Sequence, residues 1–224
     1  MAKQPEPRNY CTFYLTRHGE TVWNTQLKMQ GHLDSPLTEE GKLQARKTAL
    51  KLKDVTFDHV FSSDLLRAYK TAEIIAADRD LAIKTSKLLR ESKLGPFEGK
   101  KLQFFQKQLK KSIAYRESLS VDEKMSYKIH PDVESYDEVS TRMITFLREA
   151  AVAYPGKHCL VVSHAGIIRA SLVKLGFAAD EELPHGSIQN ASYAVIESDG
   201  VDFFVKETAG IEKKANWFFL AVNS

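Results

Sequence analysis

Short hydrophobic runs alternate with segments of helical periodicity along this chain. The hydrophobic runs predict strands over residues 10–16, 57–63, 81–89 and 158–164. Helical spacing predicts helices over residues 38–53, 63–78 and 165–176, and residues 192–207 predict a β-hairpin that turns at 198–200. This alternation is typical of α/β proteins with a mainly parallel sheet. We therefore predict a three-layer α/β sandwich with helices on both faces of the sheet, and we expect the most apolar run, 158–164, to be central.

Two of the predicted helices carry clear end signals. Thr38 is placed to cap the helix over 38–53. Ser62 or Ser63 is placed to cap the helix over 63–78. The apolar side of the first of these helices is predicted from spacing to consist of Leu43, Ala49, Leu50 and Leu52.

The stretch from about residue 100 to 150 contains no strand pattern. Hydrophobic residues recur at helical spacing over 102–113, and residues 135–154 have a second helical pattern. We predict a helical cap insertion over one end of the sheet, within a single domain that spans residues 10–224. Residues 1–9 are polar with two prolines, and we predict that they are disordered.

Composition narrows the function classes. Of the 224 residues, 43% are hydrophobic and 27% are charged, which is ordinary for a globular protein. A net charge of +3 is too small to indicate nucleic-acid binding, and no run approaches the roughly 20 apolar residues that span a membrane. Cys11 and Cys159 lie inside apolar runs, which predicts buried, reduced thiols, and the N-terminus has no secretory pattern. We expect a cytoplasmic protein that needs no metal and no cofactor.

Charged and polar residues follow the ends of the predicted strands. Arg17 and His18 follow the first strand, and His164 follows the strand over 158–164. Arg67 falls in the first turn of the helix after the second strand, and Glu91 follows the third strand. Because ligands bind beyond the carboxyl ends of the strands in open α/β sheets, these side chains predict one site.

The residue types at this site indicate phosphoryl transfer. Two guanidinium groups can bind phosphate oxygens, and the helix that begins at Ala165 offers an anion its N-terminus. A neutral imidazole can act as the nucleophile, and nearby arginines keep His18 neutral. A carboxylic acid can protonate the leaving oxygen. Gly19 and Gly166 are expected to let the backbone approach the ligand. Taken singly, each residue has a structural explanation, such as an ion pair for Arg67 or a turn cap for Asn24.

The stretch "LTRHGETVWN" resembles the motif of the histidine phosphatase superfamily, the phosphoglycerate mutase-like proteins. Further stretches are similar to that family in the same order, namely "GHLDSPLTEEG", "FSSDLLRAYKTAEII", "LLRESKLGPFEGK" and "VVSHAGIIRA". The resemblance covers roughly residues 10–206. It implies that His18 is the phosphorylated nucleophile, that Arg17, Arg67 and His164 complete the phosphate pocket, and that Glu91 is the general acid.

The resemblance also implies contacts with the substrate. These would be made by Asn24, Thr21, the backbone at Gln30 and Gly31, and the backbone N–H of Ala165. The sequence departs from the family after the acid, because "LGPFEGK" stands where many family phosphatases have Gly-x-Trp-Glu-Gly. Glu98 in this stretch is a second candidate carboxylate. We prefer Glu91 as the acid and expect Glu98 to hold the loop.

The resemblance is compatible with two reactions. A phosphatase hydrolyses the phosphohistidine, whereas a mutase returns the phosphoryl group to the bound substrate. Glu91 and His164 lie 73 residues apart, an interval similar to that of the short, broad-specificity phosphatases. The stretches "EGKK" and "SSDL" are also similar to the branch related to fructose-2,6-bisphosphatase. We therefore predict a metal-independent phosphomonoesterase acting on a small phosphorylated metabolite. The alternatives are a cofactor-dependent phosphoglycerate mutase and an interaction module with a weak phosphatase pocket.

Three features remain less specific. The cap stretch is basic and either favours substrates with a second anionic group or is a solvated helix face; its cations are Lys100, Lys101, Lys107, Lys110, Lys111 and Arg116. His185 and Asn190 are weak candidates for reaching the pocket. Trp217, Phe218 and Phe219 near the C-terminus are expected to pack on the domain or against a second copy in a homodimer.

Overall fold

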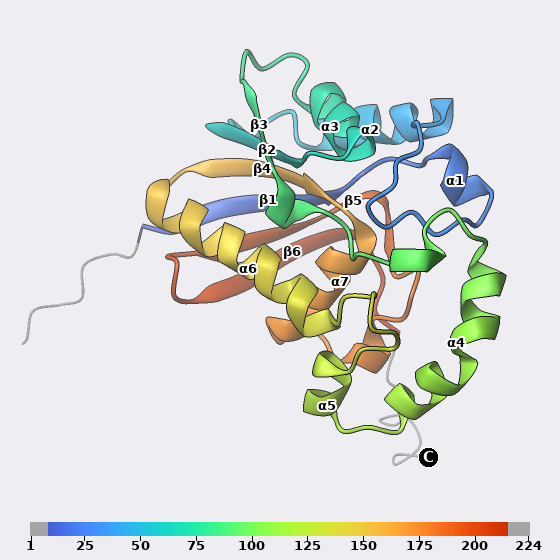
Figure 1. Ribbon diagram of the computed structural model, residues 1–224. Coiled ribbons are helices and arrows are strands. Elements are labelled where there is room, and N and C mark those ends of the chain that lie inside the picture. Colours follow the sequence, from blue (N-terminus) through green and yellow to red (C-terminus); the bar gives the residue numbers. More distant parts are fainter. Residues whose placement is uncertain (1–8, 215–224) are drawn as a thin grey trace, which may run out of the picture.

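The computed structural model describes residues 9–214, which form one domain around a six-stranded sheet (Figure 1). The strand order is β3-β2-β4-β1-β5-β6. The strands are β1 (Cys11–Arg17), β2 (His59–Ser63), β3 (Ile83–Ser86), β4 (His158–Ser163), β5 (Ile188–Ser198) and β6 (Phe203–Ile211). Strands β1 to β4 are mutually parallel, and β5 is antiparallel to both of its neighbours. The mainly parallel sheet and the C-terminal hairpin confirm the predicted fold class.

Helices cover both faces of the sheet, as Figure 1 shows. The helices are α1 (Val22–Thr25), α2 (Glu39–Lys51), α3 (Leu66–Ile75), α4 (Leu102–Glu117), α5 (Val121–Ser126), α6 (Tyr136–Ala153) and α7 (Ala165–Lys174). Short 3₁₀ turns occur at Lys87–Leu89, Gly95–Phe97 and Asp180–Glu182. Strand β4 is buried on both sides: Cys159 and Val161 pack in the core under α6 and α7, and Leu160 and Val162 in the core under α2 and α3. This position explains why its sequence is a continuous apolar run.

The buried side of α2 differs from the predicted one. Leu43 and Leu50 are 41% and 68% exposed, so their prediction as core residues was wrong. Leu52 is buried as predicted, and the rest of the stripe through which the helix packs consists of small residues, Gly41, Ala45 and Thr48. Small residues let α2 lie close to the sheet, where the Thr48 hydroxyl donates to the carbonyl of Ala191 at 2.7 Å. Spacing of large apolar residues cannot reveal such a face.

The start of α3 also differs from the prediction. The helix begins at Leu66, and neither Ser62 nor Ser63 caps it. The carboxylate of Asp34 accepts hydrogen bonds from the backbone N–H groups of Leu66 (2.5 Å) and Arg67 (3.3 Å). A distant carboxylate therefore satisfies the free N–H groups of the helix and favours its positive end.

The stretch predicted as a cap insertion divides into two parts. Helices α4 and α5 lie beside the sheet (Figure 1), and a small separate core of Phe97, Leu109 and Val133 supports α4. Helix α6 instead packs on the sheet, where Val139 and Leu147 are fully buried in the main core. Within the stretch predicted as the cap, α6 therefore contributes its apolar face to the main core of the sandwich.

Two predicted segments fall largely or wholly beyond the described residues. Of the predicted disordered residues 1–9 only Asn9 is described, and the aromatic residues 217–219 lie outside the structure.

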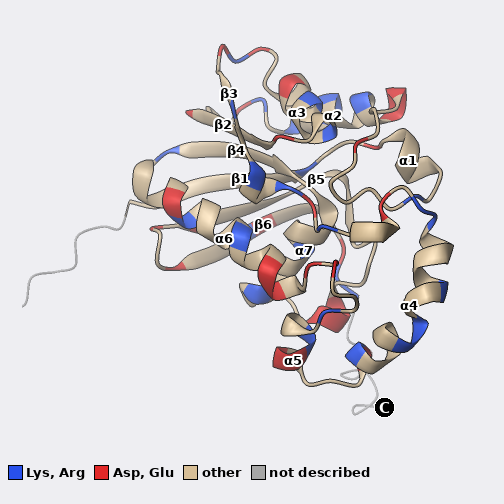
Figure 2. Ribbon diagram, in the orientation of Figure 1, with Lys and Arg blue, Asp and Glu red and all other residues tan. Residues whose placement is uncertain are grey.

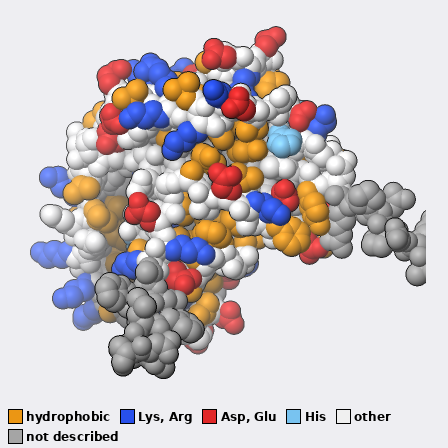
Figure 3. Space-filling view, turned by 180° about the vertical axis from the view of Figure 1, so that it is seen from behind, with side chains coloured by type: hydrophobic (Ala, Val, Ile, Leu, Met, Phe, Trp, Pro, Cys, Tyr) orange, Lys and Arg blue, Asp and Glu red, His pale blue; other side chains and the backbone are white. Residues whose placement is uncertain are grey.

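Seen from behind, the domain presents hydrophobic side chains near its centre with charged side chains around them (Figure 3).

Candidate active site

The site begins where β1 and β4 end side by side. Arg17 pairs with Ser163 across the two strands, and the backbone N–H of His18 donates to the carbonyl of Ser163 at 3.0 Å. Arg17 is therefore the last residue of β1, not the first residue after it. His18 and His164 each follow a strand directly, and both are buried. Their ring centroids lie 5.2 Å apart.

The backbone around His18 fixes the orientation of its ring. The ring Nδ1 lies 2.7 Å from the carbonyl oxygen of Gly19. Because a carbonyl oxygen only accepts, Nδ1 carries the proton and Nε2 keeps the lone pair. The carbonyl oxygen of His18 accepts from the backbone N–H of Ala191 (3.2 Å) and from Nδ2 of Asn190 (3.1 Å). Asn190 thus contacts the backbone of His18.

Burial keeps both histidines neutral. Burial first, then the positive charges of Arg67 and Arg17, lower the pKa of His18 well below its ordinary value of 6.5. The same causes, with Arg67 again the strongest charge, lower the pKa of His164. Neither ring nitrogen of His164 has a hydrogen-bond partner within residues 9–214. Buried polar atoms without partners are rare in proteins, so this ring suits a polar ligand at the site.

Two arginines place positive charge next to the histidines, and of these Arg67 is buried and Arg17 is half-buried. Arg67 is 1% exposed; its Nη1 donates to the carbonyl of Leu33 (2.6 Å) and to Oδ1 of Asp34 (3.0 Å), and its Nη2 donates to the carbonyl of Gly31 (2.8 Å). Nη1 of Arg17 donates to the carbonyl of Ile188 at 2.6 Å. In both arginines Nε is buried and has no partner among the described residues. These donors fit an anionic ligand.

Both guanidinium groups remain charged at neutral pH. Burial lowers the pKa of Arg17 to about 10, although the charge of Glu91 opposes this effect. Burial also lowers the pKa of Arg67, where the charges of Asp34 and Glu91 act in the opposite direction. The site therefore combines two cations with two neutral histidines.

Glu91 joins this group through the start of α7. Its Oε2 accepts from the backbone N–H of Gly166 (3.0 Å), and its Oε1 accepts from those of Ile167 (3.1 Å) and Ser92 (2.8 Å). A Cβ atom on Gly166 would lie 2.5 Å from Oε1 of Glu91. Gly166 therefore makes room for this carboxylate, and the expected approach of a ligand to Gly166 stays a prediction.

Glu98, the second candidate carboxylate, holds a loop. Its Oε1 accepts from the backbone N–H groups of His32 and Leu94, both at 3.0 Å. It also lies against Gly31, where φ is +53° and an added Cβ atom would come within 2.3 Å of Oε1. These contacts agree with the loop-holding role predicted for Glu98.

Gly19 makes close packing with α2 possible. A Cβ atom at this position would lie 2.3 Å from the carbonyl oxygen of Gly41 at the start of α2. The backbone N–H of Gly19 donates to the hydroxyl of Thr71 on α3 at 3.1 Å. The turn after His18 therefore packs closely against α2 and α3, and a glycine at position 19 makes this contact possible.

The remaining predicted substrate contacts lie around this group. Thr21 and Asn24 form a capping box at α1, in which Oδ1 of Asn24 accepts from the N–H and the hydroxyl of Thr21, both at 3.0 Å. Gln30 is buried, and its Oε1 has no partner among the described residues. Ala165 is the first residue of α7. Substrate binding by these residues, and by the backbone of Gly31, stays a prediction.

The basic cap residues divide into two groups. The five lysines are exposed, and Figure 2 marks the Lys and Arg positions along the α4 ribbon in blue. Arg116 is instead buried, and its Nη1 donates to Oδ2 of Asp180 at 3.1 Å. Arg116 thus joins the cap to the residues after α7 and is not part of a basic surface. His185, the other weak candidate, contacts the hydroxyl of Tyr136 at 3.3 Å.

Sequence reasoning gave no orienting role to Asp34, although it lies in the motif stretch "GHLDSPLTEEG", or to His32. Asp34 holds Arg67, and Nε2 of His32 contacts the carbonyl of Glu91 at 2.9 Å. Their partners lie 33 and 59 positions away, so no local pattern could reveal them. Within residues 9–214, no group of three or more His, Cys, Asp or Glu side chains is arranged to hold a metal ion. No helix in that range has the length and apolarity needed to cross a membrane.

Comparison with known proteins identifies the class to which this fold and site belong. Residues 13–209 match the model of the histidine phosphatase superfamily (branch 1). Phosphoglycerate mutase-like protein 4 of Arabidopsis thaliana is 37% identical over 167 residues, which cover 74% of this chain and 71% of that protein. PhoE of Bacillus subtilis, named as a phosphatase, is 34% identical over 183 residues, covering 82% of this chain and 86% of that protein. The structure of Bacillus stearothermophilus YhfR superimposes with a TM-score of 0.77 at 30% identity, covering 90% of this chain and 100% of that one.

The chain therefore belongs to the histidine phosphatase superfamily, as its motifs predicted. It is an enzyme of the phosphatase or mutase-like kind.

Proposed function

We propose that this chain is a metal-independent phosphomonoesterase that hydrolyses a small phosphorylated metabolite through a phosphohistidine on His18. The observation that carries the proposal is the state of the His18 ring. It is buried, its proton is on Nδ1, and its pKa is lowered, so Nε2 has a free lone pair at neutral pH. A histidine nucleophile needs this neutral form.

In the first step, Nε2 of His18 attacks the phosphorus atom of the ester. A P–N bond forms while the P–O bond to the leaving group breaks. Glu91, as a carboxylic acid, gives its proton to the leaving oxygen. In the second step, a water oxygen attacks the phosphorus of phosphohistidine and gives a proton to the Glu91 carboxylate. The P–N bond breaks, inorganic phosphate leaves, and Nε2 regains its lone pair.

The surrounding groups stabilise the charge on the transferring phosphoryl group. Arg17 and Arg67 remain cationic and have buried Nε–H donors that point to no protein acceptor among the described residues. His164 supplies a neutral ring that can donate one hydrogen bond. Such donors act strongly because the site is shielded from water.

Phosphoglycerate mutase activity is the second candidate, supported by the name of the Arabidopsis relative. A mutase must protect phosphohistidine from water and return the phosphoryl group to a bound sugar acid. The short cap of α4 and α5 favours hydrolysis. The complete set of His18, His164, Arg17, Arg67 and Glu91 argues against an interaction module without activity.

The test is phosphate release from a panel of phosphomonoesters in the presence of a chelator. The panel contains 3-phosphoglycerate, fructose bisphosphates and phosphoserine, and the variant His18→Ala is the control. Release by the wild-type protein and not by the variant would support the proposal. Interconversion of 2- and 3-phosphoglycerate without phosphate release would assign mutase activity instead. No turnover of any ester by the wild-type protein would contradict both.

A further inference from the structure

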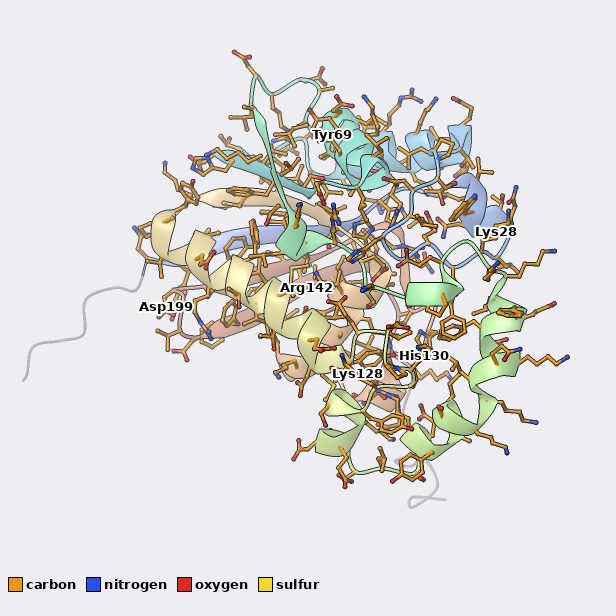
Figure 4. The ribbon with its side chains drawn as sticks, in the orientation of Figure 1. Lys28, Tyr69, Lys128, His130, Arg142 and Asp199 are labelled. Carbon is orange, nitrogen blue, oxygen red and sulfur yellow. The ribbon has the colours of Figure 1, made fainter. Side chains whose placement is uncertain are left out.

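Arg142 on α6 uses every N–H group of its guanidinium, and Figure 4 labels this residue. Nη1 donates to the carbonyls of Leu88 and Arg90, both at 2.9 Å. Nη2 donates to the carbonyl of Glu91 at 3.1 Å and to Oε2 of Glu134 at 2.8 Å, and Nε donates to Oε1 of Glu134 at 2.9 Å. A guanidinium has five N–H donors, so this side chain is fully bonded.

Residues 88–91, here called the acid segment, carry Glu91 between the end of β3 and the cap. The backbone of Arg90 and Glu91 forms no regular ladder, so its carbonyls need other donors. Side chains supply them at all four positions. Arg142 reaches the carbonyls of residues 88, 90 and 91, and the hydroxyl of Ser163 donates to that of Leu89 at 2.8 Å. The path of the acid segment therefore depends on Arg142 more than on any other side chain described.

Glu134 completes the contact from the other side. Its Oε2 accepts from the backbone N–H of Lys93 at 2.7 Å, and its own N–H donates to the carbonyl of Lys93 at 3.1 Å. The side chains of Arg142 and Glu134 are only 18% and 19% exposed. Burial raises the pKa of Glu134, but the hydrogen bonds from Arg142 and Lys93 outweigh it and lower the pKa overall. Arg142 thus holds the backbone at Glu91, and its ion-pair partner Glu134 holds the backbone at Lys93, two residues further on.

We infer that Arg142 is a positioning residue that fixes the backbone of Glu91 so that its carboxyl group reaches the leaving oxygen. This inference rests on the proposed role of Glu91 as the general acid. A lysine at position 142 would keep the positive charge but has three donors on a flexible stem, and it cannot bond three carbonyls and a carboxylate in one plane. Arg142 acts through Glu91 and has no contact of its own with the nucleophile His18.

The test compares Arg142→Lys with Arg148→Lys, a matched change on the same helix. Nε of Arg148 donates to the carbonyl of Gly200 at 2.9 Å at the far hairpin. The rate of His18 phosphorylation is measured in single turnover with p-nitrophenyl phosphate and with an alkyl phosphate. The nitrophenolate group leaves without a proton, whereas an alkoxide needs one from the acid. Loss of positioning therefore affects the two substrates unequally.

For Arg142→Lys we expect phosphorylation by the alkyl phosphate to fall about 10- to 100-fold and by p-nitrophenyl phosphate by less than about threefold. Arg148→Lys should leave both rates unchanged. Glu134→Gln keeps one acceptor oxygen for Arg142. It should also slow phosphorylation by the alkyl phosphate more than phosphorylation by p-nitrophenyl phosphate, but with a smaller difference. An equal fall with both substrates, or no fall, would overturn the inference.

Hydrogen exchange separates this inference from the proposed function. The backbone N–H groups of Ser92 and Lys93 bond to the carboxylates of Glu91 and Glu134. Arg142→Lys should speed their exchange, and Arg148→Lys should not. If the wild-type protein forms no phosphohistidine, the proposed function fails, and the exchange rates alone decide whether Arg142 holds the segment. Unchanged exchange in Arg142→Lys would show that it does not.

Discussion

The rings of His18 and His164 lie with their centroids 5.2 Å apart and their planes inclined by 61°, directly beyond two neighbouring parallel strands. The backbone holds one ring by Nδ1 and leaves its Nε2 free, while the other ring has no protein partner among the described residues. This arrangement gives the two histidines different roles: one can attack a phosphorus atom, and the other can donate to the group being transferred.

Replacing each histidine should therefore have a different result. His18→Asn should abolish labelling of the protein by radioactive substrate, with turnover reduced on the order of 10³-fold or more. His164→Asn should slow labelling by about 10²-fold without preventing it, because it removes one stabilising donor. His59→Asn, a change in β2 away from the site, serves as the control. Equal loss of labelling in the His18 and His164 variants would contradict the division of roles.

Asp34 should determine the orientation of the Arg67 guanidinium toward the substrate phosphate. Asp34→Ala removes the acceptor of Nη1 and the cap of α3, so KM for a phosphomonoester should rise about tenfold, the value of one charged hydrogen bond. Loss of the cap should lower the free energy of unfolding by about 1 kcal/mol. Steady-state kinetics and urea unfolding measure the two effects. Asp58→Ala removes a carboxylate that bonds Lys157 and His158 away from the site, and it should leave KM unchanged. A similar KM change in both variants would contradict the assignment.

The two candidate carboxylates can be separated by leaving-group dependence. Glu91→Gln should slow hydrolysis of alkyl phosphates about 10²-fold while sparing p-nitrophenyl phosphate, because a carboxamide cannot protonate the leaving oxygen. Glu98→Gln should affect both substrates alike, because Glu98 orders the backbone of His32 and Leu94. The comparison of kcat across the two substrates gives the answer. If Glu98→Gln shows the selective loss instead, Glu98 is the acid.

The lowered pKa values of His18 and His164 predict a dependence of stability on pH. A histidine whose pKa is lower in the folded state binds its proton more weakly when folded. The free energy of unfolding should therefore fall as the pH drops below the unfolded pKa of about 6.5, by up to about 1.4 kcal/mol per pH unit for each histidine. His18→Asn should make this decline less steep. Urea unfolding at pH 7, 6 and 5 provides the measurement, and parallel curves for the two proteins would be inconsistent with a buried neutral His18.

The sequence alone identified the residues whose chemistry is visible from their type and place. Alternating hydrophobic runs predicted the sheet and the helices, because burial on one or two faces imposes a period on the chain. Arg17, His18, Arg67, Glu91 and His164 were found because each lies at or after the end of a strand, or in the first turn of a helix, at the same edge of the sheet. Their convergence is a consequence of parallel topology, which the pattern already implied.

Tertiary structure decided everything that depends on partners distant in sequence. Leu43 and Leu50 proved exposed because α2 packs through small residues, and Gly19 proved to lie against Gly41. The sequence places Asp34 in a motif stretch and Arg142 in a helical pattern, but it gives neither side chain a partner. Only the folded chain brings them within hydrogen-bond distance of Arg67 and of the acid segment. Local patterns record which residues are buried, whereas hydrogen-bond geometry between distant segments exists only once the layers have packed.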